Sequence, residues 1–326
     1  MTVTSADVAR AAGVSRATVS YVLNDTPGRV LTAETRENVL RVARELGYQP
    51  NVLAKSLKRG RSNTVLFPLQ GSDMNHVLTM VLNACTEALA PRGLSLVLDM
   101  SQRQDPVAQA EAWAGLAPAA VLDLVLHHDD PALALLRDRG VHVLSTALSS
   151  GSSWESSGDV FAREQRLAQI RYLADQGHRR MVSVFPRALP DIVDPRTARR
   201  LLSDMLSTAR AGGSDLEIVE LDLDEIPSAA AHWDIPDAIA AYNDTYAIAI
   251  MTALHARGVS VPEDVAVMGA DDEPLGRAVT PALTTIAGDF RAFALGVADA
   301  VEAVLSGRTP APLPVPDLEL LVRASA

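Results

Sequence analysis

Aromatic residues and cysteine are scarce in this 326-residue chain. Phe, Trp and Tyr together make up only 4% of the residues, and there is a single cysteine, Cys85. One cysteine cannot form an intramolecular disulfide, which suits a reducing compartment. Because Cys85 lies in the apolar stretch MVLNACTEAL, we expect it to be buried. We therefore predict a cytoplasmic protein without structural disulfides.

Long hydrophobic runs are also missing. No window approaches the roughly 20 apolar residues that a membrane-spanning helix requires. The first residues, MTVTSADVAR, lack the apolar core of a signal peptide, so we expect neither membrane insertion nor export. The sequence has no glycine-rich phosphate loop, no nucleophile elbow and no zinc-ligand spacing. We therefore predict no enzyme activity, no cofactor and no metal.

Charge is distributed unevenly along the chain. Residues 1–62 contain ten Lys and Arg against five Asp and Glu, a net charge of +5. Because the whole chain carries −11, the remaining residues carry −16. A basic head on an acidic body predicts a nucleic-acid-binding module joined to a soluble domain. The length of 326 residues is enough for two or three domains.

Three short helices are predicted within the first 49 residues. Each has a Ser or Thr in position to cap its N-terminus, and a glycine follows the first and the third. Three helices with a glycine turn between the first two are typical of a helix-turn-helix unit, whose second helix enters the major groove. Spacing alone leaves open an amphipathic helix pair without a DNA-binding role. The predicted caps are Thr4, Ser15 and Thr32, and the glycines are Gly13 and Gly47.

A basic segment with apolar residues, NVLAKSLKRGRS at 51–62, follows the three helices. It is short for a stable isolated helix, so we expect it to order only when it docks on DNA. Leu57 would then act as a wedge in the minor groove, where apolar side chains bend the duplex, with Lys55 and Lys58 near phosphates.

Two runs of the head resemble the lactose/galactose repressor (LacI/GalR) family of bacterial transcriptional regulators. These runs are VTSADVARAAGVSRATVSYVLN and TRENVLRVARELGYQPNVLAKSL. Further blocks appear downstream in the order of the family, so the resemblance covers essentially the whole chain. It implies a DNA-binding domain at 1–49, a hinge helix at 50–62 and an effector-binding and dimerisation body at 63–326. The downstream blocks are GHRR at 177–180, YND at 242–244, VPEDVAVMGADD at 261–272 and PALTTI at 281–286.

Apolar strand-like runs alternate with helical runs after Asn63. This alternation predicts the α/β fold class, with parallel sheets covered by helices, and two series of it predict two Rossmann-like lobes with a cleft between them. The resemblance implies a periplasmic-binding-protein-like body in which the chain crosses three times between lobes. Lobe 1 would comprise about 63–157 and 287–307, and lobe 2 about 158–286 and 308–326. The predicted strands are TVLFPL, LSLVLDM, AVLDLVL and VHVLST, then RMVSVFP, LEIVELD, AIAAYND and VAVMGAD.

The helix at 16–23 would read the DNA sequence. We predict that Arg16 donates a bidentate pair of hydrogen bonds to guanine, that Ala17 leaves space for a thymine methyl group and that Tyr21 reaches an adjacent base or phosphate. Ser15, Thr18, Ser20 and Asn24 would hold phosphates, which fixes orientation without reading sequence. The other predicted DNA contacts are Thr4, Asn51, Ala54, Lys55, Leu57 and Lys58.

The resemblance also assigns an effector site. Asp271 and Asn243 match positions that hydrogen-bond effector hydroxyls, Phe290 matches an aromatic position lining the pocket, and Arg103 aligns with a further polar contact. We choose Arg196 as the effector clamp. A carboxylate, an amide and a ring together suit a polyol. Two simpler interpretations stay open: Asp271 as a helix or turn cap, and Phe290 as core packing.

The chain departs from the family pattern in the body. Arg196 is followed three residues later by Arg199, where a glycine is usual, and Ala147 stands where an aspartate is common. Effector identity is therefore poorly constrained, and both a sugar and a non-sugar ligand stay open. The residues His127, His128, Asp129 and Asp130 follow a strand and precede Pro131, so we predict a loop there rather than a metal site.

These features predict a homodimeric transcriptional repressor that binds a palindromic operator and is controlled by a small molecule in the cleft. Two other classes remain as alternatives. A transport-type binding protein would need export, and the basic head counts against it. A sugar- or nucleotide-acting enzyme with a DNA-binding appendage would need a nucleophile or base opposite Asp271, and the sequence supplies none.

Overall fold

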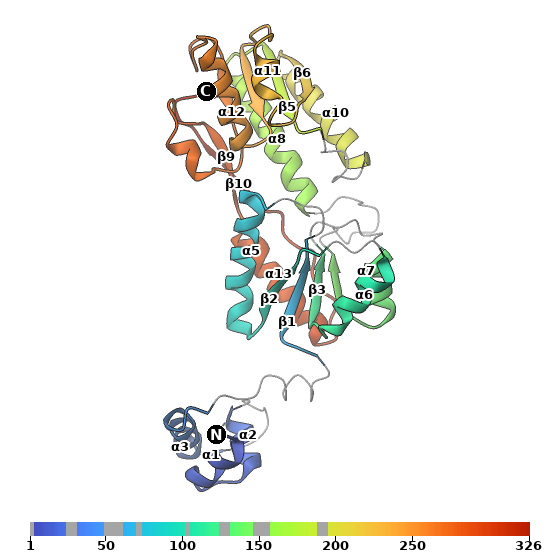
Figure 1. The fold of residues 1–326 in the computed structure, drawn as a ribbon, viewed down its shortest axis with the longest axis vertical. Coiled ribbons are helices and arrows are strands. Elements are labelled where there is room, and N and C mark those ends of the chain that lie inside the picture. The colour runs from blue at the N-terminus through green and yellow to red at the C-terminus, as the bar shows by residue number, and fades with distance from the viewer. Residues whose placement is uncertain are drawn as a thin grey trace. The chain divides into compact units, whose positions relative to one another are not determined.

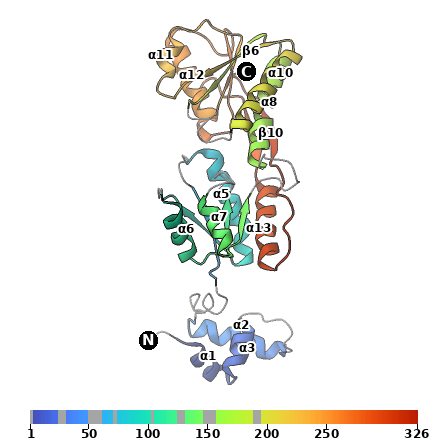
Figure 2. The same ribbon diagram turned by 90° about the vertical axis from the view of Figure 1, so that its right-hand side faces the viewer.

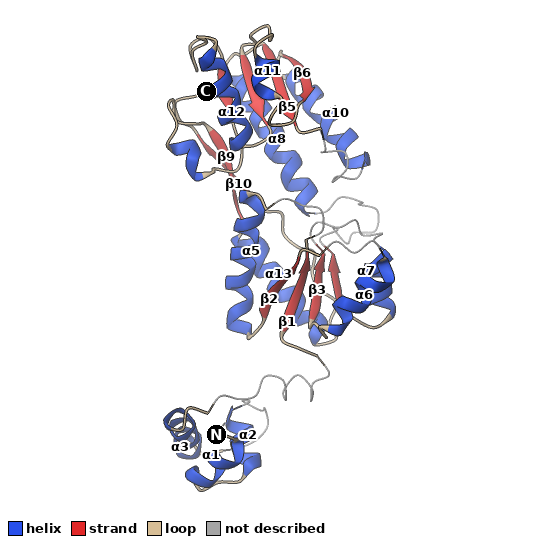
Figure 3. Cartoon of the chain, in the orientation of Figure 1, coloured by secondary structure: helices blue, strands red, loops and turns tan. Residues whose placement is uncertain are grey.

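The chain divides into two compact units, Met1–Ser62 and Asn63–Ala326. Figures 1 and 2 show their ribbons in two views, and Figure 3 shows the secondary structure. Residues 50–60 of the predicted hinge helix lie outside the described part of the chain. The computed structural model describes residues 3–23, 31–48, 61–69, 74–101, 105–123, 131–145, 157–187 and 195–326.

The described part of the head contains the three predicted helices, α1 (Ser5–Ala12), α2 (Arg16–Leu23) and α3 (Ala33–Glu45). Gly13 ends α1 in the left-handed conformation at φ 68°, which a side chain would disfavour. Asn38 of α3 donates a hydrogen bond to the Ala12 carbonyl at 3.0 Å, so α3 is tied to the end of α1. The buried residues of the head are Val8, Ala9, Ala12, Val19, Val22, Val39, Val42 and Ala43.

Polar side chains cap these helices at the predicted positions. The Thr4 backbone N–H and hydroxyl both donate to one carboxylate oxygen of Asp7, at 3.0 and 2.7 Å, and these bonds lower the pKa of Asp7. Ser15 Oγ accepts the Thr18 backbone N–H at 3.0 Å. Thr32 Oγ1 accepts the Thr35 backbone N–H at 3.2 Å. The caps predicted at Thr4, Ser15 and Thr32 are therefore confirmed.

Lobe 1 is built on a four-stranded parallel sheet in the order β2-β1-β3-β4. In this order β1 lies inside the sheet. Helices connect the strands, because parallel neighbours need a crossover connection. The strands are β1 (Thr64–Pro68), β2 (Ser95–Asp99), β3 (Ala120–Asp123) and β4 (Val143–Ser145). The intervening helices are α5 (His76–Leu89), η1 (Ala90–Arg92), α6 (Pro106–Gly115) and α7 (Pro131–Asp138).

Lobe 2 repeats this arrangement with a parallel sheet in the order β6-β5-β7-β8. Its helices include the long α8, which leads into the first strand of the lobe. The strands are β5 (Arg180–Phe185), β6 (Asp215–Glu220), β7 (Ala238–Ala241) and β8 (Ala266–Met268). The helices are α8 (Ser157–Asp175), α10 (Pro195–Ala211), α11 (Ile226–Ala230), α12 (Asp244–Ala256) and η2 (Pro274–Arg277).

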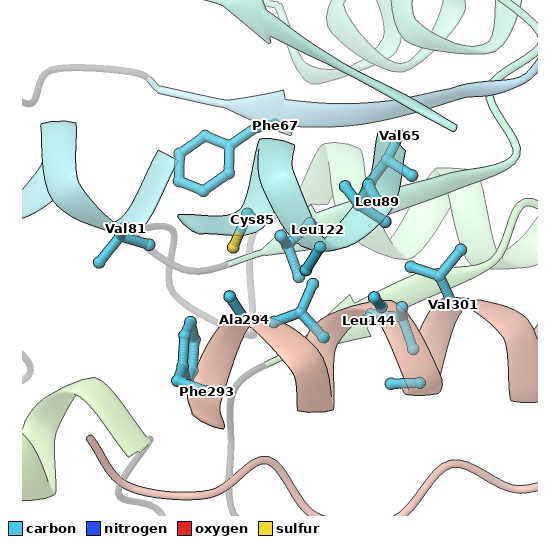
Figure 4. Packing of buried hydrophobic residues seen from close by; sticks show 14 of the residues in the cluster. Val65, Phe67, Val81, Cys85, Leu89, Leu122, Leu144, Phe293, Ala294 and Val301 are labelled. Atoms are coloured by element: carbon cyan, nitrogen blue, oxygen red, sulfur yellow. The ribbon is translucent and has the colours of Figure 1, made fainter. Parts of the chain in front are cut away.

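The last part of the chain adds an antiparallel pair, β9 (Thr285–Asp289) and β10 (Asp317–Leu321), and a helix, α13 (Arg291–Leu305). Figure 4 shows α13 packing its apolar face toward α5 and the lobe 1 strands. Cys85 lies buried in this cluster, as predicted, and burial raises the pKa of its thiol to about 12. A thiol with that pKa is neutral at physiological pH and serves packing.

Two segments that enter lobe 2 also pack on lobe 1. Phe161 of α8 and Leu313, which precedes β10, belong to the buried cluster of α5 and α13. The Ser157 hydroxyl donates to the Leu313 carbonyl at 3.0 Å, so the two segments are also joined by a hydrogen bond. No helix in the described part of the chain combines the length and hydrophobicity that a membrane crossing requires.

Candidate DNA-binding and effector sites

The start of α2 presents three adjacent exposed residues, Ser15, Arg16 and Ala17. They are exposed because Val19 and Val22, on the opposite face of α2, are buried against α1 and α3. Among the described residues, Arg16 has no ion pair or hydrogen-bond partner, so its guanidinium group keeps all its donors for a ligand. This is the geometry that base reading by Arg16 requires.

The other predicted DNA contacts in α2 are less exposed. Thr18, Ser20 and Tyr21 are half-buried. Ser15 and Thr18 hydroxyls lie 2.9 Å apart, in addition to the cap that Ser15 provides, so both also stabilise the helix N-terminus. Six predicted contacts fall outside the described residues: Asn24, Asn51, Ala54, Lys55, Leu57 and Lys58.

Asp271 lies in the turn that follows β8, at the carboxyl end of the lobe 2 sheet. Its φ of 98° and the φ of 52° at Asp272 are in the left-handed region, which residues other than glycine seldom adopt. Backbone strain of this kind clusters at functional sites, where surrounding contacts hold it in place. The Asp271 N–H donates to the Ile286 carbonyl at 2.8 Å, and this bond anchors the turn to β9.

Three polar side chains of α8 fill the space beside this turn. Gln165 donates to Asp271 Oδ1 at 3.0 Å and to the Ile286 carbonyl at 3.1 Å. Gln169 donates to the carbonyls of Ala241 at 3.1 Å and Gly269 at 2.7 Å, at the ends of β7 and β8. Arg166 lies between them and donates to Gln169 Oε1 at 3.0 Å and to Gln165 Oε1 at 3.2 Å. The ends of three strands are thus held by one helix.

Arg166 and Asp271 are buried groups of opposite charge that influence each other. Arg166 is 6% exposed, and its guanidinium carbon lies 5.1 Å from the centre of the Tyr242 ring. Burial lowers the pKa of Arg166, and the charge of Asp271 opposes that shift. Burial likewise raises the pKa of Asp271, against the effect of Arg166 and of the Gln165 hydrogen bond. Each charge therefore makes the burial of the other less unfavourable.

Asn243 is the N-cap of α12 and directly follows Tyr242, whose ring lies against Arg166. Its Oδ1 accepts the Tyr246 N–H at 3.0 Å, so the carbonyl oxygen of the amide caps the helix. The next residue, Asp244, accepts the Thr285 hydroxyl and the Glu273 N–H, both at 2.7 Å. Burial raises the pKa of Asp244 to about 7. Asp244 thus ties α12 to the strained turn and to β9.

Two of the remaining candidate effector residues, Phe290 and Arg196, lie in the described part of the chain. Phe290 is 5% exposed, packs in the lobe 1 cluster and lies 5.2 Å from the Phe161 ring, centroid to centroid. This is the core-packing role that the sequence left open. Arg196 lies exposed in the first turn of α10. Arg103 and the His127–Asp130 segment lie outside the described residues.

Comparison with known proteins identifies the chain. Residues 4–51 match the family model of bacterial regulatory proteins of the lacI family, and residues 170–326 match that of a periplasmic binding protein-like domain. The chain belongs to the lacI family. The ribose operon repressor of Escherichia coli K12 is 27% identical over 297 residues, which cover 87% of each chain. A repressor of Vibrio cholerae serotype O1 (strain M66-2), PurR, is 25% identical over 295 residues, 86% of this chain and 84% of that protein.

Solved structures agree with this assignment. A transcriptional regulator, CelR, in complex with cellobiose is 26% identical, with a TM-score of 0.66 over 99% of this chain and all of that one. The lac repressor dimer bound to operator and the anti-inducer ONPF has a TM-score of 0.75 at 24% identity, over 100% of this chain and 99% of that one, and supports the fold. The protein is therefore a lacI-family transcriptional repressor, as predicted, rather than a transport protein or an enzyme.

Gln165, Arg166 and Gln169 of this lacI-family protein were not among the predicted site residues. A signal for the two glutamines was present, since Phe161, Gln165 and Gln169 recur every four residues and share one face of a helix. Two amides on the same face as a buried ring indicate buried polar contacts. Their partners are backbone carbonyls and a carboxylate more than 70 residues away, which the local pattern does not specify.

Proposed function

We propose that this lacI-family repressor binds a palindromic operator in the cytoplasm as a homodimer, through α2 of each head. The observation that carries the proposal is the exposed Arg16–Ala17 pair at the start of α2, in a head with a net charge of +5. Arg16 supplies base readout, and the basic charge supplies affinity for phosphates. Two heads related by a two-fold axis require a site with the same symmetry.

We further propose that a small metabolite at the carboxyl end of the lobe 2 sheet controls operator affinity. Asp271 supports this assignment, since it is a strained carboxylate at the edge where ligands bind in such folds. The Nδ2 amide group of Asn243 is a second candidate donor, since only the Oδ1 of this side chain is used to cap α12. Relatives named for ribose and cellobiose support a small-metabolite effector. The effector would act by preferring one arrangement of the lobes.

Operator binding tests the first proposal. The full-length protein is titrated against duplexes from the DNA beside its gene, and palindromic segments are compared with shuffled sequences of equal composition at moderate salt. Specific binding should be at least about 10³-fold tighter than binding to shuffled DNA. Sedimentation of the complex should show two protein chains per duplex. Equal affinity for palindromic and shuffled DNA, with and without candidate metabolites, would exclude the proposal.

A further inference from the structure

A carboxylate can bind two neighbouring sugar hydroxyls at once by using both of its oxygens. Neighbouring hydroxyl groups of a sugar can each donate to one oxygen, because an ionised carboxylate accepts hydrogen bonds on both. The effector site of this protein, as proposed above, contains one carboxylate of this kind, Asp271. The ligands that this site can bind therefore depend on how many Asp271 oxygens have no donor from the protein.

One of the two oxygens already has a donor from the protein. Gln165 Nε2 lies 3.0 Å from Asp271 Oδ1, and Gln165 is 2% exposed. Asp271 itself is 8% exposed, so Oδ1 faces α8 within the lobe. Among the described residues no donor reaches Oδ2, which leaves that oxygen as the acceptor for a ligand.

Both polar atoms of the Gln165 side chain are hydrogen-bonded within the lobe. Its second amide hydrogen is used by the Ile286 carbonyl at 3.1 Å, and its Oε1 accepts from Arg166 at 3.2 Å. Arg166 is fixed in turn by Gln169 Oε1 at 3.0 Å and by the Ala241 carbonyl at 3.3 Å. A ligand that displaced Gln165 would leave buried polar groups without partners, which is unfavourable.

We propose that Gln165 determines the specificity of the effector site by occupying Oδ1 of Asp271, so that an effector meets a single carboxylate oxygen. This proposal rests on the proposed role of Asp271. The site then selects an effector whose donors reach Asp271 only at Oδ2, such as an isolated hydroxyl or a ring N–H. It disfavours sugars that need two neighbouring hydroxyls to bridge Oδ1 and Oδ2.

The test compares the full-length wild type with Gln165→Ala and Gln169→Ala. Gln169→Ala is the comparison variant: Gln169 belongs to the same network, since it accepts from Arg166 at 3.0 Å, but it binds strand carbonyls and has no hydrogen bond to Asp271. The thermal midpoint Tm of each protein is measured against increasing D-ribose and cellobiose. Neither sugar should shift Tm of the wild type or of Gln169→Ala. At least one should raise Tm of Gln165→Ala by several degrees, rising with concentration.

The double variant Gln165→Ala/Asp271→Ala should lose the sugar-induced increase in Tm that Gln165→Ala alone shows. Two results overturn the proposal: a sugar-induced shift in the wild type that Asp271→Ala abolishes, and no shift of Gln165→Ala with either sugar. If circular dichroism shows that Gln165→Ala does not fold, Gln165→Ser is tested in the same way. Operator binding by the same preparations separates the two proposals. A wild type that binds operator and is released by ribose through Asp271 keeps the proposed function and refutes the role of Gln165.

Discussion

At the scale of single residues, Arg16 and Asp271 show opposite relations to their surroundings. Arg16 is exposed at the start of α2, and its donors have no partner among the described residues. Asp271 is buried, strained and hydrogen-bonded by Gln165. An exposed cation is available to any partner of matching shape and charge. A buried carboxylate is available only to a ligand that fits what its neighbours leave free.

Replacement of Arg16 by alanine should relax discrimination at one symmetric pair of operator positions. The expected loss is about 1–3 kcal/mol for each guanine contact, because the bidentate pair of hydrogen bonds is removed. Affinities are measured for a set of operators with single base changes. Arg10→Ala is the control, since Arg10 lies on α1 and pairs with Asp7 at 3.1 Å. If Arg16→Ala weakens every operator variant equally, Arg16 contacts phosphate rather than a base.

Gly269, which follows β8, has no space for a side chain. A Cβ at this position would lie 2.1 Å from Asp244 Oδ1 and 2.9 Å from a methyl group of Leu283. Gly269→Ala should therefore lower the free energy of unfolding by about 1–3 kcal/mol, because overpacking displaces the carboxylate that holds the turn. Chemical denaturation measures the change. Gly115→Ala is the matched control, since nothing lies within 4 Å of its Cβ position. A neutral Gly269→Ala would show that Asp244 moves freely.

At the scale of elements, α8 packs in the hydrophobic clusters of both lobes. Its Phe161 packs in the lobe 1 cluster, whereas Ile170 and Leu173 pack in a cluster of lobe 2. Between them, Gln165, Arg166 and Gln169 bind the ends of the lobe 2 strands. A change in the arrangement of the lobes would therefore have to act on the helix that also holds Asp271.

Leu57 lies in the segment 50–62, which is predicted to form the hinge helix. Leu57→Ala should reduce both operator affinity and DNA bending, because the side chain of alanine is too small to separate base steps. Leu57→Met keeps an apolar side chain of similar volume and should retain bending. Bending is measured by the mobility of complexes with the operator placed at different positions of one fragment. Unchanged bending in Leu57→Ala would exclude the wedge.

At the scale of the whole molecule, charge is divided unevenly between the head and the body. The head carries +5 and the body −16, so only the head is attracted to DNA. The body would hold two heads at the separation that the operator requires, and the effector would change that separation. Control then depends on coupling between distant parts of the chain rather than on contact between effector and DNA.

Asp271→Ala should abolish the effector response and leave operator binding without effector intact. The reason is that Asp271 is buried in lobe 2 and has no part in the head. Operator affinity is measured with and without the effector for the wild type and the variant. Asp289→Ala is the control, since it removes a carboxylate that pairs with Arg291 on the surface of the same unit. A variant that still responds to effector would show that the ligand binds elsewhere.

The sequence alone determined much of this protein. Helix caps at Thr4, Ser15 and Thr32, the glycine stops and the eight parallel strands follow from local patterns, because propensity and burial repeat within a few residues. The antiparallel pair of β9 and β10 was not predicted, since the half-exposed β10 lacks the continuous apolar run that marked the other strands. Tertiary structure alone decided that Phe290 packs in the core and that Gln165 binds Asp271 across 106 residues. Contacts of that separation depend on how whole elements pack, and no local pattern records them.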